Sequence, residues 1–198
     1  MLEATGLGKR YGSRWIFRNL GFQLKTGDRL AILGSNGTGK STLLKCIAGL
    51  LSPNEGKISL PKGDPRTALA MAAIEMALYP ALTCAEHLKL AADLRGCEHR
   101  TDELLTRVGL QQATKMRSSQ LSTGMKSRLR LAMALQPNPL VLLLDEPGAA
   151  MDEAGKSLLE GIVREQSQRG VLVFATNDPD EHRFATHELM LEHTGVRA

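Results

Sequence analysis

A glycine-rich loop between an apolar strand and a helix constrains the fold of this chain most strongly. Residues Leu30-Ala-Ile-Leu33 predict a short buried strand. The loop Gly34-Ser-Asn-Gly-Thr-Gly-Lys-Ser41 follows, and apolar residues at helical spacing continue from Lys40 to Leu51. Strand, tight loop and helix in this order are typical of proteins that place helices on a parallel sheet. The sequence therefore predicts an α/β fold.

This loop matches the phosphate-loop pattern G-x-x-x-x-G-K-[ST] at every position. Its glycines allow the backbone to curl so that consecutive N–H groups point at an anion, and the helix N-terminus adds positive potential. Lys40 is placed to reach the β- and γ-phosphates, and the Ser41 hydroxyl can ligate Mg²⁺. A chance glycine-rich turn would not require the flanking strand and helix. The nucleotide-binding residues predicted here are Gly34, Ser35, Asn36, Gly37, Thr38, Gly39, Lys40, Ser41 and Thr42.

A second candidate motif is an apolar strand that ends in two carboxylates, Val141-Leu-Leu-Leu-Asp145-Glu146. In phosphate-loop enzymes a carboxylate at such a strand end holds Mg²⁺, which suits Asp145. Glu146, one residue further, could polarise an attacking water as a general base. A solvated acidic turn is the alternative for this segment alone.

The remaining pattern predicts how the chain is organised. Residues 1–67 have the pattern of strands and turns with one helix, residues 83–135 are helical, and a strand at Val171–Ala175 follows a helix that Asp152 caps. We predict a phosphate-loop NTPase core with a mostly parallel sheet, an N-terminal antiparallel β-subdomain and an inserted α-helical subdomain. A length of 198 residues favours one domain, residues 1–198, over two small ones.

Composition excludes several classes of protein. Hydrophobic residues make up 42% of the chain and charged residues 23%, which is typical of globular proteins rather than disordered ones. A net charge of +4 is too small to indicate a nucleic-acid-binding protein. The longest apolar stretch, Ala68–Leu82, contains Glu75 and Pro80 and is shorter than the ~18–20 residues of a membrane span. Three scattered cysteines without a CxxC motif suggest a reducing compartment.

A third segment, Leu121-Ser122-Thr-Gly124-Met125, begins a predicted helix. On its own it could be a simple serine N-cap or a second anion-binding helix terminus. In order along the chain, GSNGTGKS, LSTGM and LLLDEP resemble the motifs of the ATP-binding-cassette (ABC) ATPases, and the resemblance covers nearly the whole chain. It implies a head-to-tail homodimer in which each ATP lies between Gly34–Ser41 of one subunit and Ser122 and Gly124 of the other.

The resemblance also implies roles for individual residues and partners. Tyr11 matches the aromatic residue that stacks on adenine, and Asp152 matches a loop that communicates across the dimer. Lys40 and Glu146 would act in ATP hydrolysis with Mg²⁺. The helical block would receive a separate transmembrane permease, which places the protein in the cytoplasm at the inner face of the cell membrane without direct nucleic-acid contact. The segment Leu121–Met125 ends in Gly-Met. In this it is similar to the corresponding motif of export-type cassettes, which include haem exporters and drug or polysaccharide exporters.

Two departures from the family pattern affect the expected activity. Asn177 stands where the family has a His that contacts the γ-phosphate, and Asn cannot carry a proton or a positive charge. Residues 69–82 lack the family's Gln, and the nearby Glu75 could instead ligate Mg²⁺ or contact a membrane subunit. The main hypothesis is an ATP-hydrolysing transporter subunit. The alternatives are an ATP-gated clamp with weak hydrolysis and, third, a soluble ABC ATPase that acts on nucleic acid.

Overall fold

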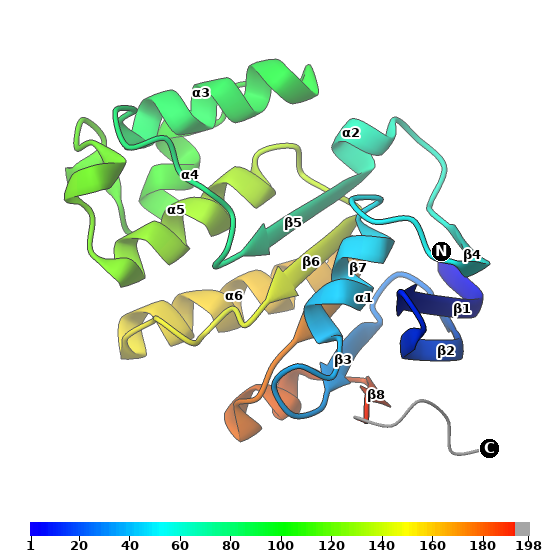
Figure 1. The fold of residues 1–198 in the computed structure, drawn as a ribbon. Helices are drawn as coiled ribbons and strands as arrows, with labels where there is room; N and C mark the ends of the chain where they lie inside the picture. The colour runs from blue at the N-terminus through cyan, green and yellow to red at the C-terminus, as the bar shows by residue number, and fades with distance from the viewer. Residues whose placement is uncertain (193–198) are drawn as a thin grey trace.

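The computed structural model describes residues 1–192, and a five-stranded parallel sheet forms their centre (Figure 1). Every neighbouring pair in the order β5-β6-β7-β3-β8 is parallel. The parallel core expected from the sequence is therefore confirmed. The strands are β3 (Arg29–Leu33), β5 (Leu69–Ala73), β6 (Val141–Asp145), β7 (Val171–Ala175) and β8 (His187–Met190).

A separate antiparallel sheet of three strands confirms the expected N-terminal β-subdomain. It has the order β2-β1-β4, with β1 (Leu2–Tyr11), β2 (Arg14–Leu24) and β4 (Glu55–Ser59). Strands β1 and β2 form a hairpin in which Tyr11 pairs with Arg14. Gly12 at the turn has φ +58°, a conformation that glycine adopts without steric cost.

Helices lie on both faces of the parallel sheet. Figure 1 shows α3, α4 and α5 together beside the edge strand β5, which confirms the helical block. Three helices begin with the caps their sequences provide: Thr83 with Glu86, Ser122, and Asp152. The helices are α1 (Lys40–Ile47), α2 (Pro65–Ala68), α3 (Cys84–Arg95), α4 (Thr101–Arg107), α5 (Thr123–Leu135) and α6 (Glu153–Arg169).

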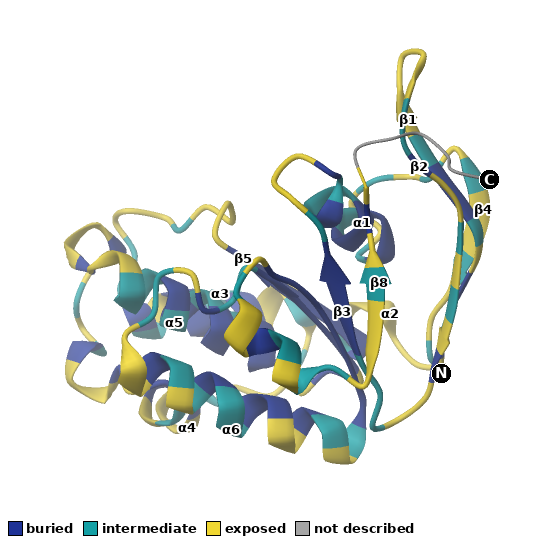
Figure 2. Ribbon diagram, turned by 90° about the horizontal axis from the view of Figure 1, so that it is seen from below, coloured by how far each residue is buried: buried dark blue, intermediate teal, exposed yellow. Residues whose placement is uncertain are grey.

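The strand pleat divides the core into two layers, which Figure 2 shows edge-on. Leu142 and Leu144 of β6 face the helices α3 to α6, while Val141 and Leu143 face α1 and the antiparallel sheet. All five residues of β6 are buried, as expected for a strand covered on both faces. The parallel strands are thereby fixed so that their carboxyl ends share one edge.

One local expectation was wrong. The helix after the glycine loop was expected to reach Leu51, but α1 ends at Ile47, because Gly49 with φ +72° ends the helical path. The sequence did not predict β5 and β8. No helix among residues 1–192 combines the length and apolar character that crossing a membrane requires.

Candidate functional site

The glycine loop connects β3 to α1 in a conformation that only glycine tolerates at key points. Gly34, Gly37 and Gly39 have φ of +142°, +81° and +106°. A Cβ atom on Gly39 would lie 2.2 Å from Ile16 Cγ2, so the β1–β2 hairpin packs directly on the loop. Gly39 is the N-cap of α1 and has no side chain to satisfy the first-turn N–H groups, which stay available for an anion.

An open pocket of about 360 Å³ lies over this helix terminus, a size typical of small-molecule sites. Ile16, from β2, is one wall that sequence reasoning missed, because a lone aliphatic residue in a strand gives no signal. The pocket is lined by Ile16, Asn36, Gly37, Gly39, Lys40, Ser41, Thr42 and Glu146.

Lys40 turns back over the loop instead of extending into solvent. Its ammonium donates to the carbonyl oxygens of Gly34 at 2.7 Å and Ser35 at 3.3 Å, and to Asn177 Oδ1 at 3.0 Å. The side chain is only 6% exposed. A positive charge is thus held at the mouth of the anion-binding loop, where phosphate oxygens could replace the carbonyl partners.

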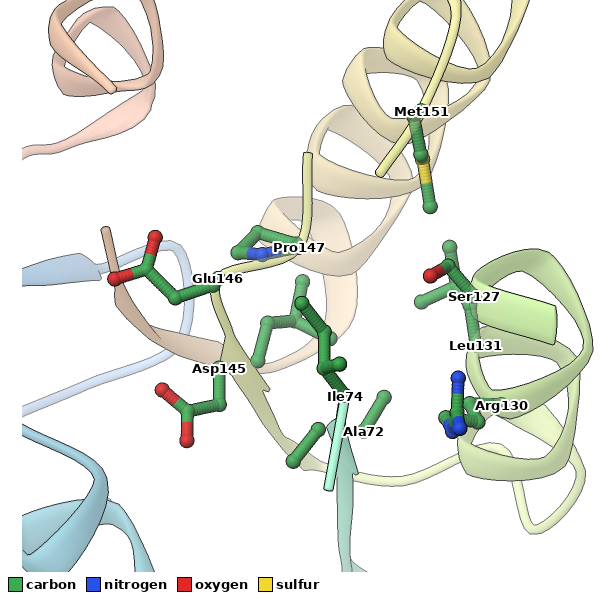
Figure 3. Close-up of a pocket in the computed structure, with 11 residues that line it drawn as sticks. Ala72, Ile74, Ser127, Arg130, Leu131, Asp145, Glu146, Pro147 and Met151 are labelled. Carbon is green, nitrogen blue, oxygen red and sulfur yellow. The ribbon is translucent and has the colours of Figure 1, made fainter. Parts of the chain in front are cut away.

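The two carboxylates at the end of β6 face the pocket side of the sheet edge. Figure 3 shows Asp145 and Glu146 directed away from α5, which carries Ser127 and Arg130, with a small cavity of about 20 Å³ between. Burial raises the pKa of Asp145, and a hydrogen bond with the Ser41 side chain opposes that rise.

The surroundings of Asp145 fit a divalent cation. Asp145 Oδ1 is buried and has no hydrogen-bond partner among the described residues. Such an orphaned acceptor costs free energy that a cation would recover. Carboxylate and hydroxyl oxygens suit Mg²⁺, which takes few protein ligands when phosphate oxygens supply the others. Within residues 1–192 no cluster of three acidic, His or Cys side chains offers a complete metal site.

Glu146 is held in a strained conformation by its neighbours. Its φ is +49°, uncommon for a residue with a side chain, and such strain occurs at functional sites. Its N–H donates to Ala175 O at 2.9 Å. Asn177 Nδ2 donates to Glu146 Oε1 at 2.9 Å, and the Asn177 N–H donates to Oε2 at 3.3 Å. The carboxylate is therefore fixed from the neighbouring strand β7.

Asn177 is the centre of this network. Its amide accepts from Lys40, donates to Glu146 and donates to Asn36 Oδ1 at 2.6 Å. Lys40 Nζ is also 3.8 Å from Glu146 Oε1. The ends of β3, β6 and β7 are thus joined at one edge of the sheet, where ligands bind in open α/β folds.

The structure leaves three predicted residues away from this pocket. Ser122 Oγ accepts from Met125 N–H at 3.2 Å, so Ser122 acts as an N-cap. A Cβ on Gly124 would lie 2.9 Å from Ala150 O, which explains the glycine by close packing. Tyr11 is 53% exposed, with Lys9 Nζ 5.4 Å from its ring centre. Among the described residues, these three are not part of the pocket lining.

Two ion pairs join segments that are far apart in the sequence. Arg128 of α5 forms an ion pair with Asp152, and Arg130 Nε donates to Met76 O at 2.7 Å, so both side chains have partners within the chain. Glu75 pairs with Lys45 of α1 at 2.6 Å. Single-sequence periodicity cannot show such long-range partners.

Comparisons with known proteins show which family and which proteins this chain resembles. The sequence model of the family described as ABC transporter matches residues 17–149. The cytochrome c biogenesis ATP-binding export protein CcmA of Bradyrhizobium diazoefficiens is 41% identical over 170 residues, 83% of this chain and 84% of that protein. The linearmycin resistance ATP-binding protein LnrL of Bacillus subtilis is 30% identical, over 99% of this chain and 66% of its own length.

Solved structures show the same fold. The structure of an ATP-binding subunit of an ABC transporter superimposes with a TM-score of 0.86 at 27% identity, covering 100% of this chain and 88% of that one. An ATP-binding cassette dimer in a post-hydrolysis state, bound to ADP and Pi, gives a TM-score of 0.85 at 24% identity, covering 100% and 97%.

Proposed function

The chain belongs to the ABC transporter family and is an ATP-binding subunit of that kind, and from this premise we propose that it hydrolyses ATP to drive a separate membrane permease. The observation that carries the proposal is the hydrogen-bonded group at one sheet edge. There Asn177 joins the loop lysine Lys40 to the strand-end carboxylate Glu146. In this proposal the Lys40 ammonium, the Glu146 carboxylate and the Asn177 amide would surround the terminal phosphate of ATP.

In the proposed mechanism the loop binds the triphosphate first. The backbone N–H groups of residues 34–41, including those at the N-terminus of α1, would donate hydrogen bonds to the phosphate oxygens. Lys40 would exchange its bonds to Gly34 O and Ser35 O for the β- and γ-phosphates. Ser41 and Asp145 would hold Mg²⁺, which would neutralise charge on the phosphates.

Glu146 would then act as the general base for the attacking water. A carboxylate must be held within hydrogen-bond reach of the water, and the Asn177 amide and N–H fix its two oxygens. For Asn177 Nδ2 to donate to a phosphate oxygen, it would exchange its bond to Asn36 Oδ1, because its two N–H groups already bond to Asn36 and Glu146. Because an amide cannot carry positive charge, we expect this donor to be weaker than a protonated His.

The proposal extends to assembly. Ser122 and Gly124 lie outside the pocket, so they would serve the ATP of a second subunit in a head-to-tail homodimer. Tyr11 would stack on adenine at the hairpin end. The permease would dock on the helical block, and this contact would hold the protein at the inner face of the cell membrane. The relative named as a cytochrome c biogenesis export protein supports an export-type system.

The experiment uses Glu146→Gln, which keeps the side-chain size and removes the base. We expect ATP binding to persist, hydrolysis to fall by ~10²-fold or more, and an ATP-bound dimer to accumulate in size-exclusion chromatography with light scattering. Asp180→Ala is the matched control, because that carboxylate is exposed and outside the pocket. Full turnover by the Gln variant would exclude Glu146 as the base.

A weakly hydrolysing, ATP-gated clamp is the second candidate function. The observation that favours it is Asn177 itself, a neutral residue that already bonds to both Lys40 and Glu146. Steady-state ATP hydrolysis by the protein together with its permease separates the two candidates. Typical enzymes turn over at ~1–10³ s⁻¹, so a turnover above ~1 s⁻¹ would exclude the clamp.

A further inference from the structure

Glu181 is a carboxyl group that the proposed chemistry does not use, yet it is buried. It lies in the short 3₁₀ helix Pro179–Phe184 that follows β7 and is 5% exposed, whereas its neighbour Asp180 is exposed. Burial of a carboxyl group costs free energy unless partners compensate. The position of Glu181 therefore requires an explanation.

The turn after β6 lies directly against this carboxyl. A Cβ atom on Gly148 would be 2.2 Å from Glu181 Oε1 and 3.4 Å from its Cδ. The φ of Gly148 is outside the left-handed region, so the backbone conformation alone does not require glycine. A side chain at position 148 would therefore have to displace the Glu181 carboxyl, which occupies that space.

Hydrogen bonds connect the same carboxyl to both strand ends. Burial raises the pKa of Glu181, and hydrogen bonds with the Thr176 side chain and the Gly148 backbone oppose that rise. The charges of Asp178 and Glu146 raise the pKa further. Glu181 Oε2 is buried without a hydrogen-bond partner in the described part of the chain, whereas Oε1 is the oxygen that lies beside Gly148.

The turn that Glu181 contacts also carries Glu146 in its strained conformation. Ala149 N–H donates to Glu146 O at 3.3 Å, and Met151 N–H donates to Gly148 O at 3.0 Å, so the turn is a short bonded unit. Gly148 therefore belongs to the same short turn as Glu146, whose side chain bonds to Asn177.

We propose that Glu181 is a positioning residue that fills the space beside Gly148 and holds the 146–149 turn, so that Glu146 stays aligned with Asn177. This inference rests on the proposed function, because Glu146 is there the base.

The experiment measures the ATPase kcat, the Kd of a fluorescent ATP analogue and the unfolding temperature for Glu181→Ala, Gly148→Ala and the double variant. We expect each single variant to lower kcat ~10- to 100-fold, since small misplacements of a catalytic group have effects of this size. The Kd should stay within about threefold, because Glu181 lies outside the pocket. Glu181→Gln keeps an oxygen that can accept from Gly148 and should retain most of the activity.

The double variant tests the packing directly. Removal of the carboxyl opens space for the new Cβ, so Gly148→Ala/Glu181→Ala should be no slower than Gly148→Ala alone. If Gly148→Ala does not fold, recovery of folding in the double variant supports the same contact. Gly161→Ala, on α6 with nothing near its Cβ, and Asp180→Ala are matched controls expected to resemble the wild type.

Other outcomes would overturn the inference. Wild-type kcat in Glu181→Ala, or single effects that simply multiply in the double variant, would show that Glu181 does not align the base. An inactive wild type would refute the proposed function itself and this inference with it, whereas an active wild type with an unaffected Glu181→Ala would refute the inference alone.

Discussion

Replacement of Asn177 tests whether its amide organises the catalytic group. Asn177→Ala removes the acceptor of Lys40 at 3.0 Å and the donor to Glu146 at 2.9 Å, while the backbone N–H bond to Glu146 can remain. Asn177→Asp has the same size and keeps the acceptor. It replaces only the donor, and thus separates the two functions of the amide.

The size of the effect follows from these contacts. Hydrogen bonds to charged groups contribute ~1.5–3 kcal/mol, and loss of one preorganised donor typically lowers kcat by ~10²–10³-fold. Asn177→Ala should fall in this range. In Asn177→Asp a carboxylate oxygen would face Glu146 Oε1 at the present 2.9 Å, so repulsion should make hydrolysis at least as slow, although Lys40 offsets part of it.

A phosphate-release assay at saturating ATP, with ATP affinity measured in parallel, gives the result. We expect kcat to fall in both variants and the Kd for ATP to change less than about fivefold, because the glycine loop is intact. Activity within threefold of the wild type in both variants would refute the role of the amide. A normal Asn177→Asp with a slow Asn177→Ala would show that only the Lys40 contact matters.

Two further predictions concern the loop and the buried carboxyl. Gly39→Ala would place a Cβ atom 2.2 Å from Ile16 Cγ2 in a backbone with φ +106°, so the affinity for ATP should fall ~10-fold or more. A fluorescence titration measures this affinity, and the control Gly161→Ala should bind ATP like the wild type. Equal affinities of the two variants would contradict the strain argument. Burial raises the pKa of Glu181, so the folded state binds the proton more tightly than the unfolded state. The unfolding free energy of the wild type relative to that of Glu181→Gln should therefore fall as pH rises from ~4.3 through the raised pKa. Urea denaturation of both proteins at several pH values measures this difference. A difference in unfolding free energy that does not change with pH would be inconsistent with the burial of Glu181.

Local patterns were sufficient for much of the fold. The loop at Gly34–Ser41, the strand at 141–145 and the caps at Ser122 and Asp152 each depend on residues close in sequence, and the structure places them as expected. Strand β5, Leu69–Ala73, was missed because Leu, Ala and Met favour helices, and only burial between β6 and the helices makes this segment a strand.

The site was less predictable, because its contacts join distant segments. The motifs identified Lys40 and Glu146, but not that Asn177 bonds to both, since these residues are far apart in sequence. The Gly148–Glu181 contact had no sequence signal, because glycine in a turn is ordinary. That residues 83–135 fold with the core as one domain, and the roles of Tyr11 and Gly124, stay predictions.

The most direct measurement mixes two inactive variants. Lys40→Ala would disable the loop, and Ser122→Asp would keep a good N-cap for α5 while placing a negative charge against the triphosphate of the second subunit. In a head-to-tail dimer, each heterodimer has one intact site, so an equal mixture should recover about a quarter of wild-type ATPase activity if subunits exchange randomly. Full activity of Ser122→Asp alone would contradict a site shared between two copies of this chain. The same conclusion would follow if the mixture of the two variants stays inactive while a mixture of wild type and Lys40→Ala hydrolyses ATP.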